Sequence, residues 1–195
     1  MNTRDLLIEI GTEELPPKAL RRMRDALQTT LLGLLAENNL AHADSEAFAT
    51  PRRLALLVRD VPESQPDRDI TKRGPALKAA FDEAGKPTKP AEGFARSCGV
   101  AVSDLEELHT DKGSWLVFHS RETGQATTDI VPGLLEKALK QLPMPKRMRW
   151  GNSDIEFVRP LHWILILFGE EPVKATILGV SSGAHSRGHR FHHNE

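Results

Sequence analysis

The stretch LLIEIGTEELPPKALRRMRDALQTTLLGLLAENN, residues 6–39, decides the fold. Its first part, residues 6–10, is apolar and partly β-branched and ends at a Gly-Thr pair, which predicts a buried strand. Two prolines follow at positions 16 and 17, where the first turn of a helix accommodates them. Apolar residues then recur at spacings of three and four: Leu20, Met23, Leu27, Leu31 and Leu34. This pattern predicts a long amphipathic helix with one core-facing stripe.

The elements predicted downstream are shorter. Two extended runs, residues 47–50 and 54–58, flank a Pro-Arg-Arg turn and complete a strand–helix–strand–strand order. Prolines, glycines and charges dominate residues 62–90, so we expect a domain edge or an inserted lobe there. Further expected elements are short helices over 76–84 and 91–98, a hairpin around 113–124, an amphipathic helix over 129–142 and a β-hairpin of 163–168 with 173–178.

These elements predict an α+β fold, with a mixed or antiparallel sheet packed against amphipathic helices and an inserted smaller lobe. We expect residues 1–61 to form the N-terminal lobe and residues 62–145 the inserted lobe. Residues 146–195, a basic segment and a β-hairpin, should complete the N-terminal core.

Composition restricts the class of protein. The formal net charge of −1 argues against a uniformly basic nucleic-acid binder, so any RNA contact must come from local clusters. Cys98 is the single cysteine, which fits a reducing compartment. The longest apolar run, residues 163–168, is far shorter than the ~20 residues of a spanning helix, and the polar start is unlike a signal peptide. We therefore expect a cytoplasmic protein that does not enter a membrane.

A series of local strings carries a family resemblance. They are LIEIGTEELP (7–16), TPRRL (50–54), KRGP (72–75), GFA (93–95), KRMRWG (146–151), FVRP (157–160) and GHRF (188–191). Each string alone is weak, but their order and spacing span nearly the whole chain. Together they resemble the β subunit of the bacterial heterotetrameric glycyl-tRNA synthetase.

The resemblance implies a subunit of an aminoacyl-tRNA synthetase that supports tRNA binding during ATP-dependent attachment of glycine to tRNA(Gly). It implies a separate α subunit and a second β subunit in an α2β2 assembly, and no role in binding DNA. The adenylation site, with the ATP and Mg that the whole enzyme uses, is expected on the α subunit, so this chain should need no cofactor. Family members are several times longer, and we expect an N-terminal fragment.

Two basic clusters in the first half of the chain are candidate RNA contacts. Arg52 and Arg53 follow a rigid proline and can bind phosphate oxygens bidentately, or alternatively cap a strand end and bridge to a nearby glutamate at position 13 or 14. Lys72 and Arg73 open the window 72–96, where six basic residues face three acidic ones. That excess could attract a phosphate backbone, although a solvated loop explains it equally well.

The string from Lys146 to Gly151 is the third cluster. It combines Lys146, Arg147 and Arg149 with Trp150, an aromatic side chain that could stack on an unpaired base. The alternative is an indole buried beneath the sheet, with the cations bound to the last carbonyls of a helix or to acidic neighbours. Either nucleic-acid or subunit contact would fit this composition.

The C-terminal string contains four histidines between residues 185 and 193. A zinc site is disfavoured because carboxylates and thiols are missing nearby, whereas Arg187 and Arg190 would repel the ion. A phosphate-facing or interface role for Arg187, His189 and Arg190 remains open, as does a structural corner with Phe191 in the core.

No motif for catalysis is present, since phosphate-binding loops and the common hydrolase and metalloprotease signatures are all missing. We therefore expect no catalytic residue and no metal site in this chain. Three hypotheses remain: a tRNA-contacting part of the ligase, a pure assembly module with no direct tRNA contact, and a free-standing editing or hydrolase domain. No nucleophile–base pair supports the third.

Overall fold

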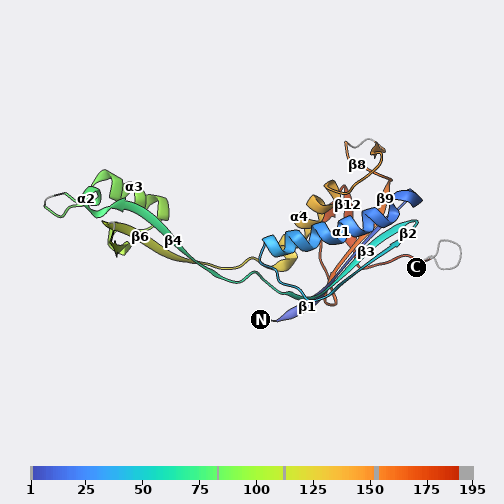
Figure 1. The fold of residues 1–195 in the computed structure, drawn as a ribbon, viewed down its shortest axis with the longest axis horizontal. Coiled ribbons are helices and arrows are strands. Elements are labelled where there is room, and N and C mark those ends of the chain that lie inside the picture. Colours follow the sequence, from blue (N-terminus) through green and yellow to red (C-terminus); the bar gives the residue numbers. More distant parts are fainter. Residues whose placement is uncertain (1, 83, 112, 152–153, 189–195) are drawn as a thin grey trace. The chain divides into compact units, whose positions relative to one another are not determined.

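A computed structural model of the protein describes residues 2–82, 84–111, 113–151 and 154–188. The chain forms two compact units (Figure 1). Unit 1 combines Met1–Gln65 with Gln125–Glu195, and unit 2 is Pro66–Gly124. Sheets and helices occur in both units, so the α+β class expected from the sequence is confirmed.

Unit 1 is built on a mixed seven-stranded sheet whose central strand is β1 (Thr3–Thr12). Strand β1 pairs in antiparallel register with β3 (Arg53–Pro62) on one side and with β9 (Leu161–Phe168) on the other. In register, Ile8 lies between Leu56 and Ile166, and all three side chains are fully buried. The apolar run at residues 6–10 therefore lies in the central strand of the sheet, which confirms the predicted buried strand.

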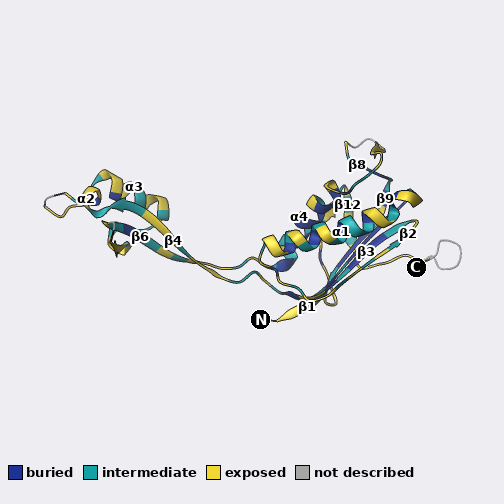
Figure 2. Ribbon diagram, in the orientation of Figure 1, coloured by how far each residue is buried: buried dark blue, intermediate teal, exposed yellow. Residues whose placement is uncertain are grey.

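Helix α1 (Pro17–Glu37) covers one face of this sheet (Figures 1 and 2). The prediction of a long amphipathic helix is confirmed, but its stripe runs at every fourth residue: Ala19, Met23, Leu27, Leu31 and Leu35. Leu20 and Leu34, expected in the stripe, are only partly buried at its edges. The helix ends where the Asn38 side chain donates to the Leu34 carbonyl at 2.8 Å and Asn39 takes a left-handed φ of 57°.

Helix α4 (Thr127–Lys140) packs beside α1 on the same face and belongs to unit 1. Its side chains Val131, Leu135 and Leu139 are fully buried in the core that contains Leu27. Unit 2, Pro66–Gly124, therefore spans fewer residues than the lobe expected over 62–145. The apolar stripe of this helix needs a large partner surface, and that surface is the helix-covered face of the main sheet.

The remaining strands of unit 1 lie at its edges. Strand β2 (Ser45–Thr50) forms a hairpin with β3 around Pro51 and Arg52, as expected. The predicted hairpin of 163–168 with 173–178 is wrong in its second arm, because β10 (Glu171–Pro172) pairs with β9 over only two residues. The run continues as β11 (Thr176–Ile177), which pairs with β12 (Val180–Gly183), and β12 occupies the edge of β9 in parallel. A separate small ladder joins β7 (Met148–Arg149) to β8 (Glu156–Phe157).

Unit 2 is a three-stranded antiparallel sheet in the order β4 (Arg68–Ala76), β6 (Gly113–Glu122), β5 (Glu106–Thr110). Helices α2 (Leu77–Ala80) and α3 (Lys89–Cys98), with the 3₁₀ turn η1 (Val102–Asp104), pack with it around a small core that includes Ala80, Ala91 and Leu116. Strand β4 lies within residues 62–90, where an inserted lobe but no strand was expected. Many of its side chains are charged and exposed. The sequence therefore lacks the apolar alternation that would have predicted a strand here.

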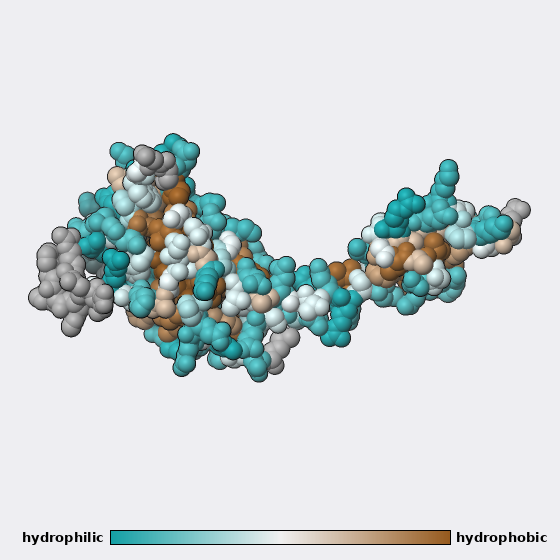
Figure 3. All heavy atoms as spheres, turned by 180° about the vertical axis from the view of Figure 1, so that it is seen from behind, coloured by the Kyte–Doolittle hydropathy of each residue, from teal (hydrophilic) through white to brown (hydrophobic). Residues whose placement is uncertain are grey.

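Each unit also shows hydrophobic residues at its surface, bordered by hydrophilic ones (Figure 3). The large apolar side chains most exposed among the described residues are Phe48, Leu108 and Met148. Of these, Phe48 and Met148 belong to unit 1 and Leu108 to unit 2.

Candidate nucleic-acid interface

Arg52 in the β2–β3 turn and Arg53 at the start of β3 make different contacts. Arg52 donates from Nε to the Thr12 carbonyl at 3.3 Å, and its Nη2 lies 3.4 Å from the Glu13 carboxylate. Arg53 points to the sheet face that the helices leave open, where its Nε lies 3.4 Å from Glu9. Bridging to Glu13, one of the alternatives open from the sequence, is thus the geometry that Arg52 adopts.

Glu9 organises a polar cluster on that open face. Only 7% of the residue is exposed, yet its carboxylate accepts hydrogen bonds from Trp163 Nε1 at 2.6 Å and from Ser186 Oγ at 2.9 Å. The Trp163 ring lies against Gly11, which has no side chain to obstruct it. Because a buried carboxylate without partners would be costly, these donors explain how Glu9 is tolerated.

Arg187 joins the same cluster. Its guanidinium lies 5.6 Å from the Trp163 ring centroid, as does that of Arg53, and its carbonyl accepts a hydrogen bond from Arg53. The cluster therefore holds the segment around Ser186 and Arg187 against strands β1, β3 and β9. His189 and Arg190, the other candidates of this string, lie outside the described residues.

Two cations of the string 146–151 bind other residues of unit 1, and one has no described partner. Arg147 donates to the Lys140 carbonyl at 2.6 Å, at the last residue of α4, and Arg149 binds Glu156 at 2.8 Å and Asp154 at 3.2 Å. Trp150 packs partly buried against the core of unit 1. Lys146 is exposed and makes no hydrogen bond or ion pair with another described residue.

Unit 2 presents cations of a different kind. Within residues 72–96, a group of exposed side chains makes no hydrogen bond or ion pair with any described residue: Lys72, Lys78, Lys86, Lys89 and Arg96. Arg73 lies over the Trp115 ring, 3.5 Å from its centroid. The five side chains without a described partner need not break an internal contact to bind a phosphate, which is the condition in which a cation gains most from it.

An acidic side chain, Asp67, joins the two ends of unit 2. Asp67 accepts a hydrogen bond from the Gly124 backbone N–H at 3.0 Å and one from Arg121 Nε at 3.1 Å. The Gly124 bond, with the nearby Arg121 charge, holds the pKa of Asp67 below its ordinary value. Arg121 is therefore engaged within unit 2, unlike the cations of residues 72–96.

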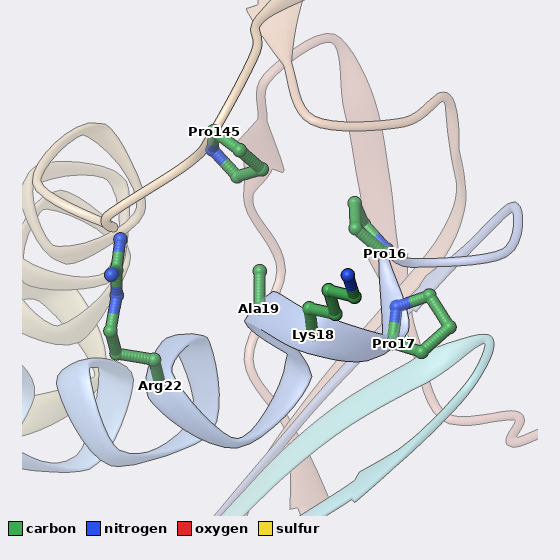
Figure 4. A pocket seen from close by; sticks show the side chains of 6 residues that line it. All are labelled: Pro16, Pro17, Lys18, Ala19, Arg22 and Pro145. Atoms are coloured by element: carbon green, nitrogen blue, oxygen red, sulfur yellow. The ribbon is translucent and has the colours of Figure 1, made fainter.

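Sequence reasoning missed two further cations, Lys18 and Arg22, at the start of α1. Both are exposed, have no ion-pair partner among the described residues, and line a groove with Pro145 (Figure 4). The signal that could have found them is a helix start with a lysine and no acidic residue in its first turn, because helix dipoles favour the opposite charge there.

The described ranges contain neither a cluster of metal-ligating side chains nor a membrane-spanning helix. Within them, no group of three or more histidines, cysteines and carboxylates is arranged to hold a metal ion. No helix in that part of the chain is long and apolar enough to cross a membrane.

Comparison with known proteins identifies the family. Residues 6–195 match the family profile described as glycyl-tRNA synthetase beta subunit. Proteins named glycine–tRNA ligase beta subunit are 53% identical over 193 residues in Hahella chejuensis and 53% over 192 residues in Chromohalobacter salexigens. The chain spans 28% of the length of each of these relatives, whereas 99% and 98% of the chain is covered. The chain therefore belongs to the glycyl-tRNA synthetase beta subunit family.

Proposed function

We propose that the chain serves a glycine–tRNA ligase as a non-catalytic part of its β subunit, and that its unit 2 contacts tRNA. The family match supports the ligase context. The observation that carries the RNA contact is the group of unpaired cations in residues 72–96 of unit 2.

The physical reason is counterion release. A cation already bound to a carboxylate gains little from a phosphate, because the new contact replaces an existing one. An unpaired cation on the surface releases condensed ions when it neutralises a phosphate, and this makes binding depend on salt. Among the described cations of unit 1 that the sequence singled out, four are bound within the unit: Arg52, Arg53, Arg147 and Arg149. Lys146 is unpaired, and Arg187 only lies over the Trp163 ring.

Trp115 adds a stacking surface to unit 2. It pairs in register with Leu108 on β5, which is among the most exposed large apolar residues. Arg73 lies on the Trp115 ring, and guanidinium and indole planes are both surfaces on which RNA bases stack. A basic surface next to an aromatic one is the usual composition of sites for RNA with unpaired bases.

The remaining partners form part of the proposal. The ligase attaches glycine to tRNA(Gly) with ATP and Mg, and its adenylation site lies on an α subunit. The chain contributes no group to that chemistry and binds no cofactor itself. Its unit 1, in which Arg52, Arg53, Arg147 and Arg149 are bound internally, supports assembly with the α subunit and a second β subunit in an α2β2 enzyme of the cytoplasm.

A pure assembly module remains the alternative function. The observation that favours it is that Arg52, Arg53, Arg147 and Arg149 are bound within unit 1. Salt-dependent tRNA binding separates the two, because an assembly module makes no phosphate contacts.

Removing Lys72 and Lys89 together should weaken tRNA binding and flatten its salt dependence. For each phosphate contact that a variant removes, the slope of log K against log salt becomes shallower by about one unit. The measurement is a tRNA titration at several salt concentrations with wild type and Lys72→Ala/Lys89→Ala. The matched control is Lys137→Ala/Lys174→Ala, which removes the same charge from exposed positions of unit 1 that have no partner among the described residues.

Two outcomes would count against the proposal. Equal slopes for wild type and both double variants would leave the assembly module as the better account. Glycine-dependent pyrophosphate exchange by the chain alone would contradict its non-catalytic role, because exchange requires an activation site that the proposal places on the α subunit.

A further inference from the structure

An open groove of about 560 Å³ lies on unit 1 at the N-terminal end of helix α1. It is lined by Pro16, Pro17, Lys18, Ala19, Arg22 and Pro145 (Figure 4). The polar cluster at Glu9 lies on a different part of unit 1, because none of its residues lines the groove. The groove is therefore a separate surface feature that the RNA-contact proposal does not use.

The walls of the groove combine two kinds of surface. Three proline rings and the Ala19 methyl group are apolar, and proline has no N–H to offer a ligand. The two remaining lining residues, Lys18 and Arg22, are cations without an ion-pair partner among the described residues, and no acidic residue lines the groove. An occupant that satisfies both surfaces must carry apolar groups and negative charge together.

The apolar surface continues beside the groove. Arg159 connects the two regions, because its Nε donates to the Glu14 carbonyl at 2.9 Å and its Nη1 lies 3.7 Å from Met148 Sδ. Met148 is one of the exposed large hydrophobic residues, and exposed Lys146 directly follows Pro145. An exposed apolar side chain, Met148, and an exposed cation, Lys146, thus lie within three residues of the groove residue Pro145.

The charge of Lys18 is unfavourable at the start of α1. A cation in the first turn of a helix is repelled by the positive end of the helix dipole, and α1 has no acidic residue in its first turn to offset this. A negatively charged occupant would relieve the repulsion. The composition of the groove favours the same kind of occupant.

We propose that this groove docks an acidic segment of the companion α subunit, with an apolar side chain against the prolines and carboxylates on Lys18 and Arg22. The identity of the partner rests on the proposed function, whereas its chemistry follows from the lining. RNA fits the lining less well, because the groove offers no aromatic ring for stacking and no side-chain amide for reading a base edge. Proline rings instead favour contact with an aliphatic or aromatic protein side chain.

The test reverses the two charges and measures assembly. The protein containing this chain is mixed with the purified α subunit, and the dissociation constant is measured for wild type and for Lys18→Glu/Arg22→Glu. We expect reversal to weaken association at least tenfold, because two attractive contacts become repulsive. Lys137→Glu/Lys174→Glu makes the same change in charge on unit 1 away from the groove and should leave the dissociation constant unchanged.

The outcomes separate this inference from the proposed function. An unchanged dissociation constant in a normally folded Lys18→Glu/Arg22→Glu variant, checked by thermal melting, would overturn the docking site and leave the proposed function intact. A loss of tRNA affinity with normal subunit association would assign the groove to RNA and likewise overturn the inference. If wild type forms no complex with the α subunit, both proposals fail together.

Discussion

Replacing Leu27 with alanine should lower the free energy of unfolding by about 2–5 kcal/mol. Leu27 is the middle residue of the buried stripe of α1 and is 1% exposed. The stripe packs against α4 and against strand residues such as Ile8 in one core cluster. Because these neighbours are themselves closely packed, they can only partly fill the cavity that the substitution leaves. Chemical denaturation monitored by circular dichroism measures the change.

The same experiment tests the phase of the helix. Leu34→Ala deletes an identical set of atoms from a residue that is only partly buried, and its cost should be clearly smaller. If Leu34→Ala proved as costly as Leu27→Ala, Leu34 would belong to the buried stripe, as the sequence predicted, in place of Leu35.

A second large effect is expected at Gly11, where substitution by alanine should cost about 3 kcal/mol. A Cβ atom built on Gly11 would lie 2.1 Å from a carbon of the Trp163 ring, far inside any van der Waals contact. The indole cannot move freely, because its Nε1 donates to Glu9 at 2.6 Å. Either the strand or the polar cluster must therefore shift, and thermal melting would report the loss of stability.

Two control variants make this prediction specific. Gly33→Ala places a methyl group on an exposed helix position with nothing within 4 Å, and should be neutral or stabilising by up to about 1 kcal/mol. Adding Trp163→Ala to Gly11→Ala removes the collision, so the double variant should lose less stability than the sum of the two single changes. Additive losses would mean that the close approach is not the cause.

The sequence predicted the elements whose apolar period is long and regular. Strand β1 and helix α1 were expected because β-branched residues and a three-and-four spacing leave few alternatives. The phase of the α1 stripe was less certain, since Leu34 and Leu35 are adjacent and only packing decides which one is buried. Helix α4 was also expected, but in the inserted lobe and not in unit 1. Periodicity shows which face of a helix is buried, but it does not show which surface that face packs against.

The candidate site was predicted less completely, for a physical reason. Residue type shows that Arg52 and Lys72 are both cations, but only the tertiary contacts distinguish a paired guanidinium from a free ammonium group. The distinction depends on Glu13 reaching Arg52 across 39 positions of sequence, which no local pattern encodes. For Lys18 a local signal did exist, in its position at a helix start.

The central claim is that unit 2 carries the tRNA contact, and excision of the unit tests it most directly. The chain enters and leaves unit 2 at neighbouring points, because Gln65 N–H donates to the Gln125 carbonyl at 2.9 Å. Residues 66–124 can therefore be replaced by a two-residue Asn-Gly turn. Unit 1 should still fold, since its core cluster contains no residue from that range.

The decisive measurement is the tRNA affinity of this excision variant at several salt concentrations, beside that of the intact chain. We predict that affinity falls and that the salt slope becomes shallower by several units, about one for each phosphate that the cations of residues 72–96 neutralise in the intact chain. An excision variant that folds cooperatively and binds tRNA with the affinity and salt slope of the intact chain would contradict the claim.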